Sequence, residues 1–441
     1  MVVITKQGAV EGVEREGCRA FYGIPYAKAP VGELRWRPPQ PMEPWEGIRS
    51  AGSFPARSIQ PQGGGNDFYG REFRDEPAYV TEVSEDCLYL NIWTPAKEAG
   101  EKLPVAFWIH GGAFLGGCGH EKEFDGAAYC SRGVILVTIN YRLGLLGFLA
   151  HPWLSRESEH QVSGNYGTLD QIAALRWVYE NIEAFGGDPS NITVFGQSAG
   201  AMSVQGLVST PLTEGMIARA IMQSGGGCGT GLAHERITLR EQEHYGEIFA
   251  ELAGAEELAE LRELPAQELL RLFEPFMEKV MPKAGGLFLA PTIDGYLWEE
   301  GLSETASQGR VKRIPYLLGS NQDDMLVTPK QKETGEYGEL HHACIRFARA
   351  MEKQQGGPVW LYYFSHNLPG DQAGAFHSAE LWYTFGTLER SWRPFTGADE
   401  RLSGELLDYW TNFMKTGDPN GPGLEEWEPF AGEAGYIRQF V

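Results

Sequence analysis

Long apolar runs and an excess of basic residues are both missing from this sequence of 441 residues. No stretch approaches the roughly 18 consecutive apolar residues that a helix needs to cross a bilayer. Lys and Arg number 37 against 59 Asp and Glu, which gives a net charge of −22. A surface of that sign repels nucleic acid and anionic membrane surfaces. We therefore expect neither a nucleic-acid partner nor a membrane span.

Metal-binding cysteine spacings and secretion signals are also missing. The six cysteines form no Cys-x-x-Cys pair and no zinc-type pattern with histidine. The start of the chain, Met1 to Gly8, has neither the basic residues nor the apolar run of a signal peptide. We therefore expect no metal site, a cytoplasmic location and reduced thiols.

Short apolar runs bounded by Gly or Pro recur along the chain and predict buried strands. They span residues 104–109, 133–139, 192–195, 218–222, 316–319 and 359–364, with an alternating strand at 88–93. Helical patterns lie between them at 169–182 and 402–415, and the first places Ile172, Leu175, Val178 and Tyr179 on one stripe. This alternation predicts an α/β fold, in which helices cover both faces of a mostly parallel, twisted sheet.

Two further segments stand apart from this pattern. The short strands at 2–5, 9–13 and 18–22 predict a small N-terminal antiparallel meander. The charged helical stretch from Thr238 to Met281 predicts a cap over the carboxyl edge of the sheet, as an insertion at about 238–300. We find no other break, so residues 1–441 are expected to form a single domain.

Gly196-Gln197-Ser198-Ala199-Gly200 is the strongest chemical signal in the sequence, because it follows a predicted strand and precedes a helical run. This is the context of a nucleophile elbow, in which a serine on a sharp turn stands above the sheet. Glycines two before and two after the serine let strand and helix approach closely. The pattern predicts Ser198 as a nucleophile.

The stretch Trp108 to Phe114, WIHGGAF, ends an earlier buried strand with consecutive glycines. A tetrahedral acyl intermediate needs fixed N–H donors for its oxyanion. A Gly-rich loop after a strand supplies such donors, together with the amide that follows the nucleophile. We therefore expect an oxyanion hole formed by Gly111, Gly112, Ala113 and Ala199.

These segments resemble the type-B carboxylesterase family, which includes bacterial para-nitrobenzyl-type esterases and, more distantly, cholinesterases. The resemblance extends over most of the chain. The other matching motifs are FYGIPYA at 21–27, LRW at 34–36, SEDCLYLNIW at 84–93, NYRLG at 140–144, GNYGTLDQ at 164–171 and FGGDPSNIT at 185–193. The resemblance implies an α/β-hydrolase fold and a serine hydrolase of carboxylic esters.

The resemblance also implies the partners of Ser198, in the chain order serine, acid, histidine. Residues 314–324 end a strand where the family carries its acid, so Asp324 is the aligned candidate. The family usually has Glu there, and the neighbouring Asp323 remains an alternative. Residues 374–381 resemble the histidine loop of the family and supply His377. Of the other histidines, His110 is expected to order the oxyanion loop, His341 and His342 to open a surface-exposed helical run, and His366 to lie at a strand end.

The implied reaction is acyl transfer through an acyl-enzyme, which needs no metal or cofactor. Gln197 and Ser224 are expected directly behind the triad. Arg35 with Glu85, and Arg142 with Asp170, resemble structural ion pairs of the family. Secreted relatives pair a cysteine at the position of Cys87 with an upstream cysteine, but residues 54–58 contain none, so no such disulfide is expected.

Several alternatives stay open at this point. The same triad would serve an amidase or a thioesterase, and the fold also hosts non-catalytic binding proteins. A cholinesterase is disfavoured because the loop from Gly63 to Ser84 has no Trp to hold a quaternary ammonium. Trp382, Tyr383 and Phe385 follow the histidine and suggest either core packing or a pocket for aryl or phenolic-acid esters. A small-molecule ester and a monomer or homodimer are the expected partner and assembly.

Overall fold

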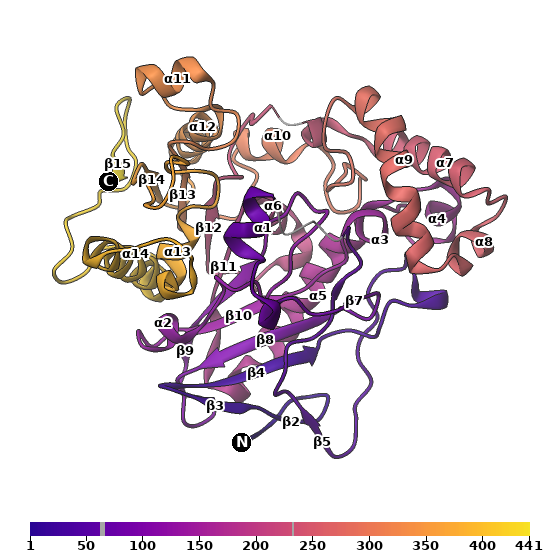
Figure 1. The fold of residues 1–441 in the computed structure, drawn as a ribbon, viewed down its shortest axis with the longest axis horizontal. Helices are drawn as coiled ribbons and strands as arrows, with labels where there is room; N and C mark the ends of the chain where they lie inside the picture. Colours follow the sequence, from indigo (N-terminus) through magenta and orange to yellow (C-terminus); the bar gives the residue numbers. More distant parts are fainter. Residues whose placement is uncertain (62–66, 232) are drawn as a thin grey trace.

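The computed structural model describes residues 1–61, 67–231 and 233–441, and its dominant feature is a ten-stranded sheet. Gly63, where the segment without Trp begins, lies outside the described residues. The strand order is β15-β14-β13-β12-β11-β9-β10-β8-β4-β3. Pairing is parallel from β15 to β10 and antiparallel from β10 to β3. The predicted α/β fold with a mostly parallel sheet is therefore confirmed (Figure 1).

The strands are β1 Val2–Ile4, β2 Ala9–Glu11, β3 Val13–Arg15, β4 Cys18–Pro25, β5 Ile48–Ser50, β6 Arg57–Ser58, β7 Val83–Ser84, β8 Tyr89–Thr94, β9 Leu103–Ile109, β10 Ile135–Ile139, β11 Gly187–Gln197, β12 Arg219–Gln223, β13 Tyr316–Asn321, β14 Val359–Phe364 and β15 Ile437–Phe440. The α-helices are α1 Phe68–Phe73, α2 Ala127–Cys130, α3 Gly144–Phe148, α4 Pro152–Glu157, α5 Tyr166–Asn181, α6 Ala199–Ser209, α7 Leu239–Ala253, α8 Leu258–Glu263, α9 Ala266–Ala284, α10 Leu302–Ser307, α11 Pro329–Thr334, α12 Glu339–Lys353, α13 Leu381–Phe385 and α14 Gly397–Thr416.

The central strands carry apolar side chains on both faces, because each face packs against a different core. In β9, Val105 and Phe107 belong to one hydrophobic cluster, whereas Ala106 and Trp108 belong to the other. Helices α5, α6 and α12 contact the sheet on the side of the first cluster, and α2 and α14 on the side of the second. The alternation of side chains along a strand thus produces two cores separated by the backbone of one sheet.

The N-terminal segment differs from the predicted meander. Strands β1 and β2 pair antiparallel, but β2 then pairs with β5 in a separate three-stranded sheet. Strands β3 and β4 instead extend the main sheet beyond β8. The meander was therefore wrong for β4, because Phe21 and Ile24 bury their side chains in the main core and so draw β4 into the large sheet.

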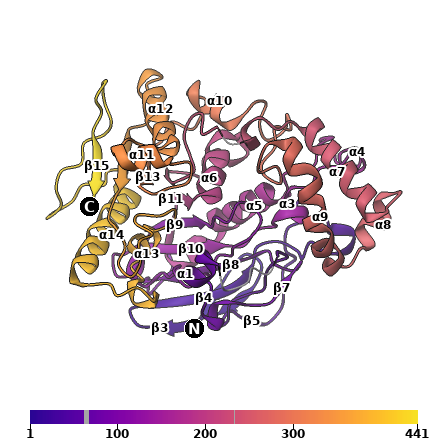
Figure 2. The same cartoon turned by 45° about the horizontal axis from the view of Figure 1, so that its top comes forward.

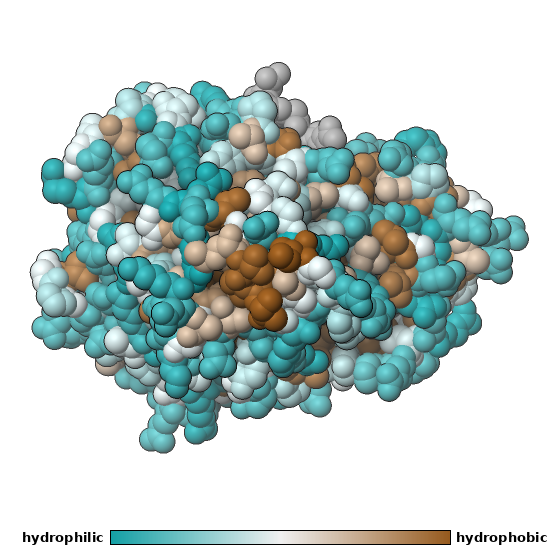
Figure 3. Space-filling model, turned by 90° about the horizontal axis from the view of Figure 1, so that it is seen from below, coloured by the Kyte–Doolittle hydropathy of each residue, from teal (hydrophilic) through white to brown (hydrophobic). Residues whose placement is uncertain are grey.

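The small sheet lies at the lower edge of the molecule in Figure 1 and exposes several apolar side chains. Val2, Ile4 and Ile48 are 41%, 69% and 60% exposed. The view from below shows a compact hydrophobic patch on an otherwise mainly hydrophilic face (Figure 3).

The region predicted as a cap contains helices α7, α8 and α9, which end at Ala284. Residues 285–301 contain no helix or strand, so the helical part is shorter than the expected insertion at about 238–300. Both ribbon views place α7–α9 at the opposite end of the molecule from α13 and α14 (Figures 1 and 2). Phe249 and Phe276 of these helices join the same hydrophobic cluster as the sheet. The assignment of residues 1–441 to one domain remains a prediction.

Of the other predictions about local structure, some are confirmed and one is wrong. The ion pairs Arg35–Glu85 at 2.5 Å and Arg142–Asp170 at 2.7 Å are confirmed, and both are largely buried. Tyr179 was placed on the buried stripe of α5, but it is 40% exposed. Among the helices of the described residues, none combines the length and apolar character needed to cross a membrane.

Candidate active site

Ser198 stands between the end of β11 and the start of α6, on a strained turn with φ 57° and ψ −127°. Its backbone N–H donates to the carbonyl of Gln223 on β12, at 2.8 Å. A Cβ on Gly196 would lie 2.5 Å from the backbone of Gly200, and one on Gly200 would lie 2.0 Å from the carbonyl oxygen of Ile109. Both glycines are therefore required, because no larger residue fits where strand, turn and helix meet.

The structure brings His377 and Asp324 together, with 2.5 Å between Nδ1 of the imidazole and Oδ1 of the carboxylate. The backbone amides of Asn321 and Met325 donate to Asp324 at 2.9 and 2.8 Å and hold its orientation. The alternative carboxylate has other partners. Asp323 forms an ion pair with Lys332 at 2.9 Å and accepts from the amide of Ala375 at 3.0 Å.

Burial and charge act in opposite directions on the His377 imidazole. Burial lowers its pKa, but the charge and hydrogen bond of Asp324, with a further contribution from the charge of Glu380, raise the pKa above 6.5. The imidazolium form is thus stabilised in spite of its burial. A histidine with these partners can accept a proton and hold it.

A cavity of about 280 Å³ opens in front of Ser198 and His377. For Trp382, Tyr383 and Phe385 the sequence left core packing and a pocket open, and all three lie in the core without exposed surface. The aromatic part of the cavity wall comes from elsewhere in the chain. It consists of Tyr69, Phe73, Trp108 and Phe124.

The predicted oxyanion loop borders this cavity through Gly111, Gly112 and Ala113. Gly112 and Ala113 have positive φ angles of 102° and 56°, which is unusual for an alanine. The loop lies against the elbow, since a Cβ on Gly111 would be 3.1 Å from Cβ of Ser198. Ala199, the fourth predicted donor, is the first residue of α6.

His110 supports the loop from behind. Its Nδ1 donates to the carbonyl oxygen of Gly111 at 2.8 Å, and its ring stacks on Tyr141 with centroids 4.6 Å apart. Burial lowers the pKa of His110 to about 4, so the ring is neutral at neutral pH. A Cβ on Gly117 would lie 2.7 Å from Nδ1 of this ring. These contacts give His110 a structural place in the loop.

The two residues expected behind the triad differ in what they touch. The amide Nε2 of Gln197 lies 3.2 Å from Nε2 of His377, on the opposite side of the ring from Asp324. Ser224 has φ 51°, and its amide donates to the carbonyl of Gly319 at 2.8 Å. Its hydroxyl is buried and has no hydrogen-bond partner among the described residues.

Glu380 is a buried acid that the sequence reasoning missed. Asn321 donates to its Oε2 at 2.5 Å and Gln223 to its Oε1 at 3.3 Å. Burial raises the pKa of Glu380 to about 7, and the charge of Asp324 adds to this effect. The available signal was a carboxyl group in an apolar stretch three residues after His377.

Of the two histidines expected in a surface-exposed run, His342 is exposed but His341 is not. His341 was expected on the surface, but it is fully buried in α12 and lies 3.1 Å from the hydroxyl of Ser320. Burial lowers its pKa to about 3. The amphipathic pattern of α12 turns this histidine inward, together with Leu340 and Cys344.

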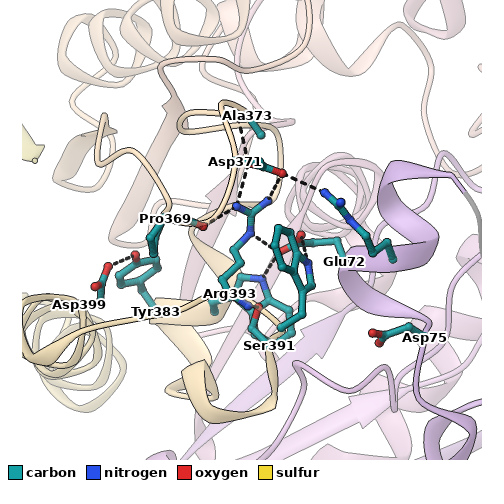
Figure 4. A network of polar contacts seen from close by, with 12 residues as sticks. Glu72, Asp75, Pro369, Asp371, Ala373, Tyr383, Ser391, Arg393 and Asp399 are labelled. Carbon is teal, nitrogen blue, oxygen red and sulfur yellow. Dashed lines mark hydrogen bonds and ion pairs between the residues drawn. The ribbon is translucent and has the colours of Figure 1, made fainter.

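Helix α1 covers one side of the cavity with Tyr69 and Phe73, and the hydroxyl of Tyr69 donates to the carbonyl of His377 at 3.3 Å. Glu72 of α1 forms an ion pair with Arg393 at 2.8 Å, and neither side chain has exposed surface. Figure 4 shows how Arg393 also reaches Asp371 and the carbonyl of Pro369.

Two tryptophans complete the partners of Glu72. The indole of Trp382 donates to its Oε1 at 2.8 Å, and that of Trp392 donates to its Oε2 at 3.0 Å. The network therefore fastens a short helix near the N-terminal third of the chain to the segment that follows His377.

A serine follows a central strand of a mostly parallel sheet on a strained strand-to-helix turn, and it borders the same cavity as the imidazole of an imidazole–carboxylate pair. Together these features define a hydrolase of the α/β class. Comparison with known proteins narrows the class. The model of the carboxylesterase family matches residues 1–342 and 336–439. The chain belongs to this family and is a serine carboxylesterase.

Individual relatives agree with this assignment. The chain is 35% identical over 475 residues to a fumonisin B1 esterase of Sphingopyxis macrogoltabida, covering 97% of this chain and 84% of the relative. It is 33% identical to the para-nitrobenzyl esterase of Bacillus subtilis, covering 95% of this chain and 90% of that protein. The solved structure of a thermophilic para-nitrobenzyl esterase superposes with a TM-score of 0.84 at 31% identity, covering 98% of this chain and 94% of that one.

Proposed function

We propose that this esterase works through a triad of Ser198, His377 and Asp324 and an acyl-enzyme intermediate. The observation that carries the proposal is the 2.5 Å contact between His377 and Asp324, made by an imidazole that borders the same cavity as Ser198. A carboxylate on Nδ1 fixes the tautomer that leaves Nε2 free to accept a proton.

In the proposed reaction, His377 takes the proton of Ser198 as Oγ attacks the carbonyl carbon of the ester. The imidazolium then protonates the departing alcohol and later removes a proton from the water that hydrolyses the acyl-enzyme. The raised pKa of His377 supports this part, because its partners stabilise the protonated ring.

The amides of Gly111, Gly112, Ala113 and Ala199 are the proposed donors to the oxyanion. Removing one such donor typically costs about 3–4 kcal/mol of transition-state stabilisation. The strained backbone at Gly112 and Ala113 supports this role, because positive φ angles persist only where the surroundings impose them.

Gln197 gives the resting site one further feature. Its amide occupies Nε2 of His377, the nitrogen that has to receive the proton of Ser198. We infer that this contact yields to Ser198 when an ester enters the cavity. Ser224, directly before the glycine that packs under Ser198, is proposed to support the turn.

Small to medium esters, including aryl and phenolic-acid esters, are the proposed substrates. The cavity of about 280 Å³ and its four aromatic side chains support this range. An aromatic ring in the substrate would pack edge or face against such a wall. An amidase or thioesterase with the same triad is the competing proposal, and a non-catalytic binding protein is disfavoured by the complete set of reacting groups.

The test is a panel of alkyl, para-nitrobenzyl and hydroxycinnamate esters beside a thioester and an anilide of matched acyl group. We expect the esters to be turned over fastest, and Ser198→Ala to lower kcat by about 10³-fold or more. Ser209→Ala, a serine at the far end of α6, is the matched control and should retain activity. Equal rates for wild type and Ser198→Ala would refute the triad, and a faster anilide or thioester would reassign the substrate class.

A further inference from the structure

One corner of the active-site cavity is acidic. Arg74, Glu121 and Glu123 border the cavity together, whereas most of the rest of its wall is uncharged. Glu121 is paired with Arg74, with 3.5 Å between Oε1 and Nε. Arg74 thus provides a counter-charge for one of the two carboxyl groups.

Glu123 forms no ion pair within the described part of the chain. Its residue is 1% exposed, and its Oε2 has no hydrogen-bond partner among the described residues. The neighbouring cation is engaged elsewhere, because Lys122 pairs with Asp75 and lies 5.5 Å from the ring centroid of Trp382. A buried carboxyl oxygen without a partner is rare in folded proteins, and a functional role is one of its few explanations.

The loop that carries Glu123 is rigidly held. Thr387 donates its hydroxyl hydrogen to the carbonyl of Glu123 at 3.0 Å, and Arg390 donates to the carbonyl of Lys122 at 3.0 Å. The next residue, Phe124, packs against Trp108 with ring centroids 5.0 Å apart. The backbone that carries the Glu123 side chain is therefore held in place at the cavity wall in advance, as a group that recognises a ligand needs.

We propose that Glu123 is a specificity-determining residue that accepts a hydrogen bond from the substrate, so that the enzyme prefers esters carrying a hydroxyl or ammonium group. The inference rests on the proposed function of the same cavity. The donor would stand on the acyl or alcohol part of the ester, away from the scissile bond. The donor would bond to the carboxyl group of Glu123, whose Oε2 has no partner among the residues that the structure describes.

Electrostatics support this reading. Burial raises the pKa of Glu123 well above its ordinary value, and the charge of Glu121 raises it further. A neutral carboxyl group can exchange hydrogen bonds with a hydroxyl, whereas an arriving ammonium would stabilise the ionised form. A hydroxyl and an ammonium group would therefore both donate a hydrogen bond to Glu123, and the experiment below distinguishes between them.

The experiment measures kcat/KM of three enzymes, the wild type, Glu123→Leu and Glu123→Gln, on matched pairs of ester substrates. Chromogenic para-nitrophenyl esters carry linear acyl chains of several lengths, each ending in a methyl, hydroxyl or ammonium group. A second series places the same three groups on the alcohol part and is followed with a pH indicator. The measured quantity is the ratio of kcat/KM for each polar ester to that for its methyl-ended partner.

For the wild-type enzyme, we expect kcat/KM for at least one polar ester to exceed that for its methyl-ended partner by roughly 10-fold or more. A buried hydrogen bond would provide a difference of this size. Glu123→Leu should abolish that ratio. Glu123→Gln should retain preference for a hydroxyl and lose preference for an ammonium. The control is Glu389→Gln, which removes a carboxylate that is 71% exposed, and it should leave the ratio unchanged.

Two results overturn the inference. In the first, no polar ester of either series exceeds its methyl-ended partner. In the second, Glu123→Leu changes both members of a pair by the same factor, so that the ratio stays as in wild type. Wild type that hydrolyses no ester above the Ser198→Ala background would instead refute the proposed function. Thermal melts of each variant establish whether it is folded, so that a loss of substrate preference is not confused with unfolding.

Discussion

Asp323 and Asp324 are neighbours in sequence, but they have different partners in the fold. Asp324 contacts His377, and Asp323 is paired with Lys332 near the surface. The family motif left Asp323 open as an alternative, because the local sequence does not show which carboxylate the turn after β13 directs inward. The resemblance favoured Asp324, and the contact agrees with that preference.

Replacement of these two acids tests the choice. Asp324→Asn should lower kcat by about 10⁴-fold, because an amide on Nδ1 stabilises the wrong tautomer of His377. Asp323→Asn should lower kcat far less, since it loses mainly a pair with a half-exposed lysine. Steady-state rates on one chromogenic ester suffice. Similar losses in the two variants would contradict the assignment.

The pH profile reports on the charges around His377. The base must be neutral to accept a proton, and its pKa is raised above 6.5. We therefore expect kcat/KM to decrease as the pH is lowered, with a midpoint at a pH above 6.5. Glu380 contributes to that rise when it is ionised. Glu380→Gln removes the charge and should move the midpoint to lower pH. A midpoint that stays in place or moves upward would exclude electrostatic coupling between the two groups.

At the scale of elements, α1 is the part of the site that no sequence pattern predicted. It has six residues, includes a glycine, and lies in a stretch rich in Pro and Gly that reads as a loop. Its N-cap Asp67, which accepts from the amide of Gly70 at 2.6 Å, is the only local sign of a helix start that we recognise. Tertiary contacts of Glu72 hold the helix in place, and such contacts are invisible to local propensity.

Breaking the buried pair should therefore loosen one wall of the cavity. Glu72→Gln removes one of the two carboxylates that pair with the buried Arg393 and leaves it with Asp371, whose side chain is 25% exposed, so we expect a loss somewhat below the about 3–5 kcal/mol that an unpaired buried charge costs. We expect a lower Tm, faster proteolysis between residues 67 and 75, and a larger effect on KM than on kcat. Arg71→Gln on the same helix is the control, because its pair with Asp371 is half exposed and is worth at most about 1 kcal/mol. Equal sensitivity of the two variants would contradict this role.

At the scale of the whole molecule, most of the sheet could be predicted, and the errors lie at its edges. Apolar runs identify strands buried on both faces, such as β9 and β14. Strand β15 has the sequence IRQF and no apolar run; its pairing with β14 alone makes it a strand. Strand β4 was assigned to a separate meander for the same reason, because pairing partners at an edge are not encoded locally.

The single-domain assignment can be tested by calorimetry. Phe249 and Phe276 of α7 and α9 share the cluster that fills one face of the sheet, so the region should unfold with it. We expect one endotherm for the whole chain. A separate transition that is lost when residues 238–284 are replaced by a short linker would contradict a single domain. The oligomeric state and the cytoplasmic location stay predictions, and sedimentation and cell fractionation address them.

The two cores on opposite faces of the sheet have a consequence for engineering. The backbone of the sheet separates the core under α6 from the core under α14, so side chains in the two cores share few contacts. Substitutions at such distant sites change the free energy of unfolding almost additively. A combinatorial library could therefore be divided into two halves, each screened alone for thermostability, and the best solutions of the two halves joined in one gene. Only variants near Ser198, where β11 passes between both halves, would need joint screening.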